Sequence, residues 1–351
     1  SKRINPLHSQ PLDMQQFISE MPKAELHVHL EGTLEPELSF ALATKNNIPL
    51  EYKTPEQLVA AYDFHDLPSF LKIYYAGMNV LINESDFYQL TWDYLVKAAS
   101  ENIVYAELFF DPQAHTSRGV SFETIITGIH KAQLDAEQKL GINSQLIMCF
   151  LRELSAESAM EHLKLAMPYL PWLVGVGLDS NERDNPPTKF AEVFAKARAL
   201  DLKLTMHCDV NQLNTLNHIE QCLDEIQVDR IDHGVNALQD PVLLEKIKQK
   251  KLGLTVCPIS NRFVVQSLTS AEIRQMLEHN ILVTINSDDP AYFRAYLNEN
   301  FIELQKEGQF SAQDIVTMVE NSFKVAWLKD SEINQYLAQV SQYTKQAQKA
   351  A

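Results

Sequence analysis

Glu25-Leu26-His27-Val28-His29 ends the first short apolar run of the chain, Ala24–His29, and this stretch decides the fold. Side chains alternate along a β-strand, so His27 and His29 point to the same side. Two imidazoles at positions i and i+2 can bind one metal ion, although two histidines can also share a strand by chance. The stretch predicts a strand with a polar carboxyl end, and the runs that follow decide which kind of sheet it joins.

Seven further runs of this kind occur along the chain, and amphipathic stretches such as Phe122–Leu140 and Lys189–Leu200 lie between them. Eight strands alternating with helices predict an α/β fold, a (β/α)8 barrel of the TIM type. The segment Ile48–Gln89 is longer than one crossover helix requires, and we interpret it as an insertion near the barrel mouth after the first strand. The predicted strands are Ala24–His29, Ile103–Phe110, Gln145–Phe150, Leu173–Asp179, Leu202–His207, Val228–Asp232, Leu252–Cys257 and Ile281–Asn286.

The length and composition suit one large domain. The chain has 351 residues, of which 45% are hydrophobic, and both figures are ordinary for a single barrel. We find no low-complexity tract, charge block or short repeat that would divide it. The predicted organisation is an N-terminal extension, residues 1–13, followed by one barrel domain, residues 14–351.

The charge of the chain disfavours several classes of partner. A formal net charge of −16 repels phosphate backbones and anionic lipid, so we expect neither nucleic acid nor membrane partners. No apolar run approaches the roughly 20 residues that span a bilayer, and the first residues lack the apolar core of a signal peptide. The four cysteines show no CxxC spacing, which favours a reducing cytoplasm. The sequence predicts no particular oligomeric state.

Histidines and carboxylates recur where the predicted strands end. His207 ends the fifth strand, Asp232-His233 ends the sixth, and Asn286-Ser287-Asp288-Asp289-Pro290 follows the eighth. Active sites of this fold lie at the carboxyl ends of the strands, so these side chains converge with His27 and His29 on one mouth. Three imidazoles and a carboxylate suit zinc with one open position for water, although iron, cobalt or manganese could replace it.

Several stretches of the sequence carry a resemblance to a known family. Met21 to Gly32 (MPKAELHVHLEG), Arg230 to Gly234 (RIDHG) and Ser287 to Pro290 (SDDP) resemble motifs of the adenosine and adenine deaminases. Tyr105 to Gln113 (YAELFFDPQ), Gly177 to Ser180 (GLDS) and Asn286 to Phe293 resemble the bacterial and fungal adenine deaminase branch in particular. The similarity extends from about residue 14 to about residue 330.

The resemblance implies a role for each matching residue. His27, His29, His207 and Asp288 would bind one zinc ion per chain. His233 would orient the zinc-bound water and stabilise charge on its oxygen during attack on purine C6, unless it is a core histidine bonded to backbone. Asp289 would take part in catalysis and would also bind the substrate near ring atom N7. The other substrate-binding residues would be Gly177, through its backbone N–H near N3, and His29. The alternative for Gly177 is a tight strand end.

The chain departs from the family after the fifth strand. There the family carries Ala-Gly-Glu after the zinc histidine, and that glutamate protonates ring atom N1. Here the residues are Cys208-Asp209-Val210, and valine cannot carry a proton. Asp209 is the nearest carboxylate, and it could take the catalytic role if the loop backbone shifts. The alternatives are that Asp209 is a loop residue and that Glu31 or Glu182 supplies the proton.

Three functions follow from these observations. The first is zinc-dependent hydrolytic deamination of a 6-aminopurine, adenine or adenosine, with release of ammonia. The second is hydrolysis of a related substrate, such as an N6-substituted purine or a nucleotide, because Val210 replaces the usual glutamate. The third is a non-catalytic purine-binding protein. In all three the partner is a small purine. The aromatic group Phe64, Phe70, Tyr74 and Tyr75 would form either core or a lid over that ligand.

Overall fold

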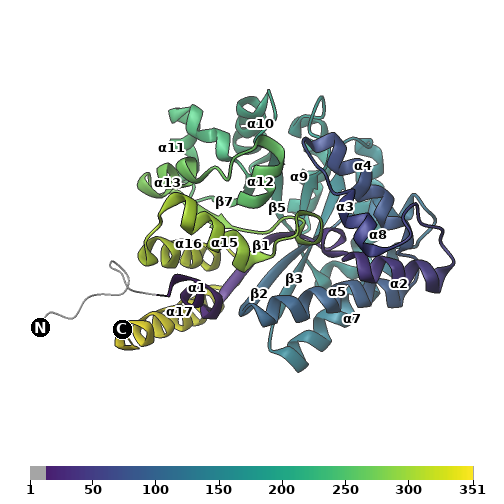
Figure 1. Cartoon of the computed structure of the whole chain (residues 1–351). Coiled ribbons are helices and arrows are strands. Elements are labelled where there is room, and N and C mark those ends of the chain that lie inside the picture. Colours follow the sequence, from purple (N-terminus) through teal and green to yellow (C-terminus); the bar gives the residue numbers. More distant parts are fainter. Residues whose placement is uncertain (1–12, 351) are drawn as a thin grey trace, which may run out of the picture.

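Eight parallel strands form the centre of the molecule in the computed structural model, which describes residues 13–350 (Figure 1). The strands neighbour one another in chain order, β1 to β8. Each lies within two residues of its predicted bounds, and β2 and β4 coincide with them. The strands are β1 Lys23–His29, β2 Ile103–Phe110, β3 Asn143–Leu151, β4 Leu173–Asp179, β5 Lys203–Cys208, β6 Arg230–His233, β7 Gly253–Val256 and β8 Leu282–Ile285.

The sheet closes between its last and first strands, just past the end of β8. The His29 N–H donates to the Asp288 carbonyl at 2.9 Å, and the Asp288 N–H donates to the His27 carbonyl at 3.0 Å. Val28 and Asp288 form the corresponding parallel bridge. The predicted (β/α)8 barrel is therefore confirmed, and its closure joins the strand end that carries two histidines to the segment that carries two aspartates.

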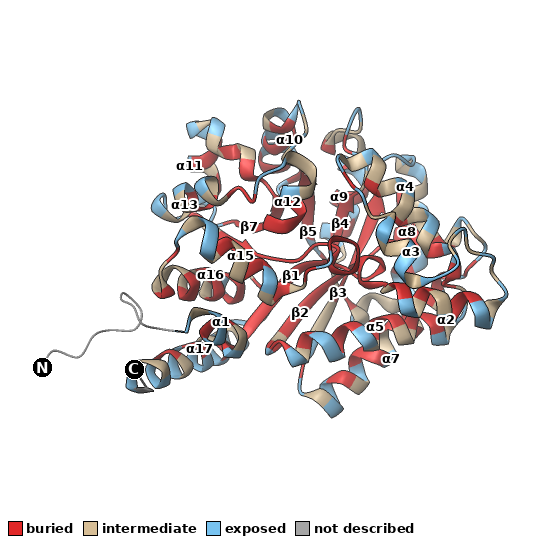
Figure 2. Ribbon diagram, in the orientation of Figure 1, coloured by how far each residue is buried: buried red, intermediate tan, exposed pale blue. Residues whose placement is uncertain are grey.

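Helices surround the barrel, and most of them bury one face (Figure 2). The predicted stretch Phe122–Leu140 is α7, in which Ser121 caps the N-terminus and Gly141 ends the helix in a left-handed conformation. The helices are α1 Met14–Glu20, α2 Pro36–Asn46, α3 Pro55–Ala60, α4 Leu67–Gly77, α5 Glu84–Ser100, α6 Pro112–Thr116, α7 Phe122–Leu140, α8 Ala156–Ala166, α9 Ala191–Ala199, α10 Thr215–Gln221, α11 Pro241–Gln249, α12 Pro258–Val265, α13 Ser270–Glu278, α14 Pro290–Phe293, α15 Leu297–Gly308, α16 Ala312–Lys324 and α17 Asp330–Ala350.

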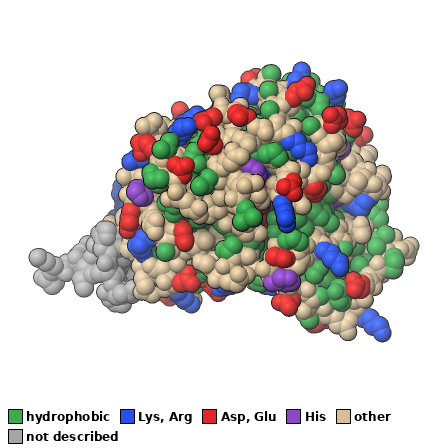
Figure 3. All heavy atoms as spheres, turned by 90° about the horizontal axis from the view of Figure 1, so that it is seen from above, with side chains coloured by type: hydrophobic (Ala, Val, Ile, Leu, Met, Phe, Trp, Pro, Cys, Tyr) green, Lys and Arg blue, Asp and Glu red, His purple; other side chains and the backbone are tan. Residues whose placement is uncertain are grey.

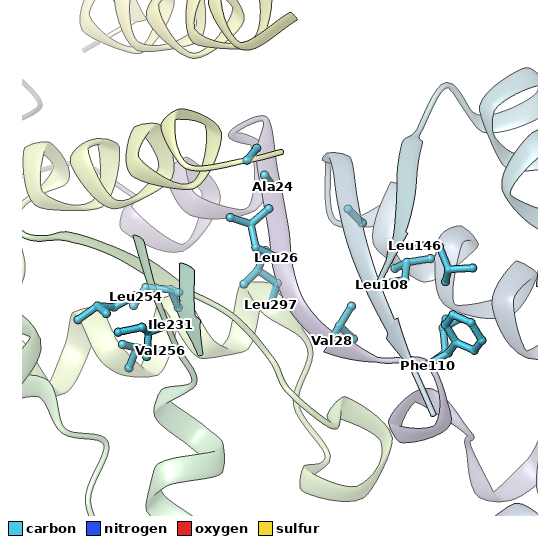
Figure 4. Packing of buried hydrophobic residues seen from close by; sticks show 14 of the residues in the cluster. Ala24, Leu26, Val28, Leu108, Phe110, Leu146, Ile231, Leu254, Val256 and Leu297 are labelled. Atoms are coloured by element: carbon cyan, nitrogen blue, oxygen red, sulfur yellow. The ribbon is translucent and has the colours of Figure 1, made fainter. Parts of the chain in front are cut away.

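Side chains pack in two layers because residues alternate along each strand. Ala24, Leu26 and Val28 of β1 belong to the large cluster between the strands and the helices (Figure 4). A smaller cluster inside the barrel contains Phe109, Ile147, Cys149 and Trp327. The ring of Phe109 contacts the rings of His27, His29 and His207, so this inner cluster supports the floor of the site.

A buried ion pair lies at the opposite, amino-terminal end of the barrel. Arg230 Nη2 donates to Glu107 Oε1 at 2.6 Å, and neither side chain is exposed. The other carboxylate oxygen of Glu107 accepts from the Trp327 N–H and the Tyr105 hydroxyl. The Arg230 guanidinium also stacks on the Trp327 ring, 4.1 Å from its centroid. The network links β2, β6 and Trp327, which follows α16, and so it closes this end of the barrel.

The long connection between β1 and β2 contains α2, α3, α4 and the crossover helix α5. The predicted insertion Ile48–Gln89 runs into α5, which begins at Glu84, so the extra structure within it is α3, α4 and their loops. Helix α4 carries the aromatic side chains of this segment to the barrel mouth. The connection thus supplies part of the cavity described below.

The two ends of the described chain lie side by side, where the Tyr343 hydroxyl of α17 donates to the Phe17 carbonyl of α1 (Figure 1). The division into residues 1–13 and 14–351 stays a prediction, because residues 1–12 lie outside the described part. Within residues 13–350, no helix is both long and apolar enough to cross a bilayer. Acidic and basic side chains are interspersed on the face shown in Figure 3.

Candidate active site

Four of the predicted site residues bring one ligand atom each to a common point at the barrel mouth. His27 Nε2 and His29 Nε2 lie 3.3 and 3.2 Å from Asp288 Oδ1, and His207 Nε2 lies 3.2 Å from His29 Nε2. Tetrahedral ligands at zinc-like bond lengths are about 3.3 Å apart, since each bond is about 2.0–2.1 Å. Within the described residues, His27, His29 and His207 also form a group able to hold a metal ion. The spacing of these atoms fits a metal ion.

The far side of each ligand is held by a buried partner. His207 Nδ1 lies 3.0 Å from Asp232 Oδ2, and His27 Nδ1 lies 3.0 Å from the Thr255 hydroxyl. These partners turn Nε2 of both rings toward the common point.

The other two ligands also face buried side chains, although His29 Nδ1 forms no hydrogen bond within the described residues. His29 Nδ1 faces Asp179 Oδ2 at 3.4 Å, and the Ser260 hydroxyl donates to Asp288 Oδ2 at 2.8 Å. Nε2 of each histidine and Oδ1 of Asp288 therefore remain available to bind a cation.

Electrostatics at this point favour positive charge. Burial alone would lower the pKa of His29, but the carboxylates of Asp289, Asp288 and Asp179 raise it to about 10. At His207, by contrast, burial lowers the pKa to about 3 despite its bond to Asp232. A cation held here would balance the carboxylates, and a neutral imidazole is the form that binds metal.

A cavity opens above these ligands. His233 and Asp209 line it together, and His233 Nε2 lies 3.3 Å from Asp209 Oδ1. Burial lowers the pKa of His233 and raises that of Asp209 to about 7. The lining residues are His29, Leu67, Phe70, Leu71, Tyr74, Tyr75, Asp111, Asp179, Ser180, His207, Asp209, Val210, Asn211, His233, Ser260, Asn261, Val264, Asp288, Asp289 and Phe293.

Six buried polar atoms of cavity-lining residues have no hydrogen-bond partner among the described residues. They are His29 Nδ1, the Tyr74 hydroxyl, Asp111 Oδ1, Asp179 Oδ1, His233 Nδ1 and Asp289 Oδ1. His233 also has a left-handed backbone, with φ of 65°, at the end of β6. Buried polar atoms are usually paired, so unpaired ones in a cavity indicate groups that meet a ligand.

Gly177 is the predicted site residue that the structure places elsewhere. It lies in β4 two residues before Asp179, and the cavity lining begins at Asp179. A Cβ at Gly177 would meet Cys149 Sγ at 2.9 Å, so packing inside the barrel explains this glycine. The residue at the mouth of β4 is instead Ser180, whose φ of 78° turns the chain away from the strand.

The insertion helix α4 forms one wall of the cavity. Phe70, Tyr74 and Tyr75 line it, whereas Phe64 packs behind them against Phe70. The Tyr75 hydroxyl donates to Ser180 Oγ at 2.6 Å and so ties α4 to the end of β4. Both alternatives for the aromatic group hold in part: Phe64, Phe70 and Tyr74 belong to a buried hydrophobic cluster, and Phe70, Tyr74 and Tyr75 also line the cavity.

Two carboxyl groups of the cavity were not predicted as site residues. Asp111 follows β2 and Asp179 ends β4, and both line the cavity close to His29. Burial and the neighbouring carboxylates raise the pKa of Asp111 well above its usual range, and burial raises that of Asp179 to about 6. Their positions at strand ends are the signal that could have identified them.

A closely packed glycine supports the position of Asp289. A Cβ on Gly32 would lie only 2.1 Å from Asp289 Oδ1 and 2.8 Å from the Asp289 Cα. Only a residue without a side chain leaves room for the carboxyl group there. Gly32 is thus a structural requirement of the site, although it does not itself line the cavity.

Comparisons with known proteins agree with this geometry. The chain is 50% identical to an uncharacterized deaminase of Schizosaccharomyces pombe over 94% of this chain and 98% of that protein. It is 47% identical to an adenine deaminase of Psychrobacter cryohalolentis over 93% and 98% of the two chains. The crystal structure of an adenine deaminase from Arthrobacter aurescens superposes with a TM-score of 0.89 at 40% identity, covering 93% of this chain and 99% of that one.

A family model described as adenosine deaminase matches residues 22–343, which include every side chain of the cavity. The match covers the barrel, the insertion and most of α17. The chain belongs to the adenosine deaminase family of metal-dependent aminohydrolases.

Proposed function

We propose that this protein hydrolyses the exocyclic amine of a 6-aminopurine and that adenine is its preferred substrate. The observation that carries the proposal is the convergence of three imidazoles and Asp288 beneath a buried cavity with unpaired polar atoms. The adenine deaminases among its relatives support the choice of the free base. The products are a 6-oxopurine and ammonia.

One zinc ion per chain is the proposed cofactor, held by His27, His29, His207 and Asp288. When bound, zinc makes hydroxide available from water at neutral pH. Three nitrogens and one oxygen are donors that zinc accepts, and the supporting partners of each ligand favour a preformed site. Elemental analysis of purified protein should give one equivalent, and His27→Ala should lose it. Full-occupancy metal in His27→Ala would exclude this ligand set.

The other side chains bind the substrate and move protons. His233 stabilises charge on the oxygen that attacks C6, because its ring contacts the rings of His27 and His207 and its Nε2 lies 3.9 Å from Asp288 Oδ2. Asp289 forms a hydrogen bond with the ring near N7. Asp209 delivers a proton to N1, because attack at C6 pushes electrons onto the ring and Val210 offers no proton.

The wall formed by α4 keeps bulk water from the reacting atoms. Phe70, Tyr74 and Phe293 present aromatic surface to the cavity, which suits a planar purine. Exclusion of water also strengthens the hydrogen bonds made to the ring. We propose the cytoplasm as the location, because the four cysteines are free and buried in the described structure.

A second substrate class has a specific observation in its favour. Val210, Leu71 and Val264 give the cavity an apolar part, which would accommodate an alkyl group on the exocyclic nitrogen. The reaction would be the same hydrolysis, with an amine in place of ammonia as the product.

A substrate screen tests the proposal. Zinc-loaded protein is mixed with adenine, adenosine, N6-methyladenine and AMP at equal, subsaturating concentrations, and ultraviolet change and released amine are measured. We expect the fastest turnover with adenine, and none after zinc is removed by a chelator. Faster turnover of adenosine than adenine would refute the preference for the free base. Release of methylamine at a rate above that of ammonia would favour the second class.

A further inference from the structure

The ligand His207 and the three residues that depart from the family, Cys208 to Val210, are each held by a partner from another element. Because β5 ends at Cys208, Asp209 and Val210 lie past the strand and are held by these contacts without the strand pairing. The contacts are Arg152 Nη1 to the His207 carbonyl at 2.9 Å, the Gly234 N–H to the Cys208 carbonyl at 3.1 Å, the Asp209 N–H to Glu182 Oε1 at 2.8 Å, and Asn236 Nδ2 to the Val210 carbonyl at 2.9 Å.

Glu182 is the one carboxylate in this set, and its two oxygens are divided between two partners. Oε1 accepts from the Asp209 N–H, and Oε2 lies 2.6 Å from His218 Nδ1 of α10. Arg152 Nη1 lies 3.9 Å from Oε1. Glu182 is only 1% exposed, so these groups hold a buried charge in place.

The side chain of Glu182 is directed to backbone and to His218, and the cavity lining does not include it. Asp209, by contrast, lines the cavity next to His233. Side chains at i and i+2 of an extended chain share a face, so Asp209 points the same way as the ligand His207 as long as the chain stays extended. The Glu182 contact to the Asp209 N–H keeps the chain in that path beyond the last strand residue.

We infer that Glu182 is a positioning residue, which fixes the peptide of Asp209 so that this shorter carboxyl group reaches the cavity in place of the family's glutamate. The inference rests on the proposed function, in which Asp209 carries the proton to the ring. It assigns Glu182, an alternative proton donor in the sequence, a role that acts through Asp209. His218 and Arg152 hold Glu182 in turn.

Three variants at this position separate positioning from folding. Glu182→Ala removes the acceptor, and we expect kcat to fall roughly 10- to 100-fold with little change in KM, since small displacements of a reacting group cost about this much. Glu182→Gln keeps Oε1 and should restore kcat to within a few-fold of wild type. Glu182→Asp keeps the charge but shortens the reach, so it should lose kcat even if Glu182→Ala fails to fold.

A double-mutant cycle with Asp209→Asn tests whether Glu182 acts through Asp209. Adding Glu182→Asp to Asp209→Asn should cause no further loss of kcat. The matched control is Asp229→Ala: Asp229 Oδ2 accepts the Leu204 N–H at 2.9 Å, near the other end of β5, and its loss should leave kcat unchanged. Metal content and melting temperature are recorded for every variant.

The outcomes distinguish the inference from the function on which it rests. If Asp209→Asn retains full activity, Asp209 is not the proton carrier, and the proposed mechanism and the inference fail together. If Asp209→Asn is impaired but the Glu182 variants are active, or if the two losses multiply, the mechanism stands and the positioning role is wrong. A Glu182→Gln variant as impaired as Glu182→Ala would also overturn it.

Discussion

His207 and Asp232 meet across β5 and β6, with Nδ1 of the imidazole 3.0 Å from Oδ2 of the carboxylate. The other oxygen of Asp232 accepts from the Thr255 hydroxyl, which also contacts His27. Although burial opposes it, the bond to His207 holds the pKa of Asp232 well below its usual range. One carboxylate thereby orients two of the metal ligands.

Asp232→Asn should therefore weaken metal binding by about 10- to 100-fold, the usual effect of losing a partner behind a ligand. The measurement is competition between the protein and a zinc chelator, with metal read by elemental analysis. Fold is checked by circular dichroism. Unchanged affinity in a folded variant would mean that the four ligands hold the metal without this support.

Loss of His233 should act on turnover. His233→Ala should lower kcat by about 10²–10³-fold, since it removes a group that stabilises charge in the transition state, while zinc content stays at one equivalent. The matched control is His162→Ala on α8, another buried histidine, whose nitrogens bond the Thr116 hydroxyl and the Ser158 carbonyl away from the cavity. Wild-type kcat in His233→Ala would show that another residue does this work.

Substitutions at Asp209 and Val210 test which of the two positions can hold the proton donor. Asp209→Asn should lose about 10²–10⁴-fold in kcat and still bind zinc, because an amide has no carboxyl proton to deliver. Asp209→Asn/Val210→Glu should recover part of the activity only if position 210 can reach the ring. Steady-state rates on adenine decide, and an Asp209→Asn enzyme as fast as wild type would contradict the assignment.

Gly32→Ala should impair the site although Gly32 does not itself line the cavity. Its methyl group would lie 2.1 Å from Asp289 Oδ1, so Asp289 has to move, and kcat/KM should fall by about 100-fold. Gly141→Ala is the control: no atom lies within 4 Å of its Cβ, but its φ of 68° costs about 1–2 kcal/mol of stability. If both variants kept wild-type kcat/KM, the close approach of Gly32 to Asp289 would not matter for activity.

The Glu107–Arg230 ion pair at the amino-terminal end of the barrel should affect the stability of the protein and not its activity. Glu107→Ala leaves Arg230 buried without its partner and should lower the free energy of unfolding by about 3–5 kcal/mol. Glu84→Ala breaks an exposed pair with Lys131 and should cost less than about 1 kcal/mol. Denaturant unfolding of both metal-loaded variants compares them. Equal losses would mean that burial gives the Glu107–Arg230 pair no special importance.

The sequence by itself determined the barrel. Strands such as Ile103–Phe110 and Leu173–Asp179 coincide with β2 and β4 because a short run of apolar and β-branched residues is a local signal, readable without knowing its neighbours. The convergence of His27, His207, His233 and Asp288 also follows from sequence, because the fold sends every strand end to one mouth.

Only the tertiary structure decided which atoms meet there. A Cβ at Gly177 would meet Cys149 Sγ of the neighbouring strand at 2.9 Å, and the sequence of β4 alone does not indicate this contact between strands. Asp111 and Asp179 become cavity residues, and Glu182 turns to the Asp209 N–H, through contacts between segments far apart in the chain. Such contacts depend on the register and twist of the closed sheet, and the pattern of apolar residues within one strand or helix determines neither.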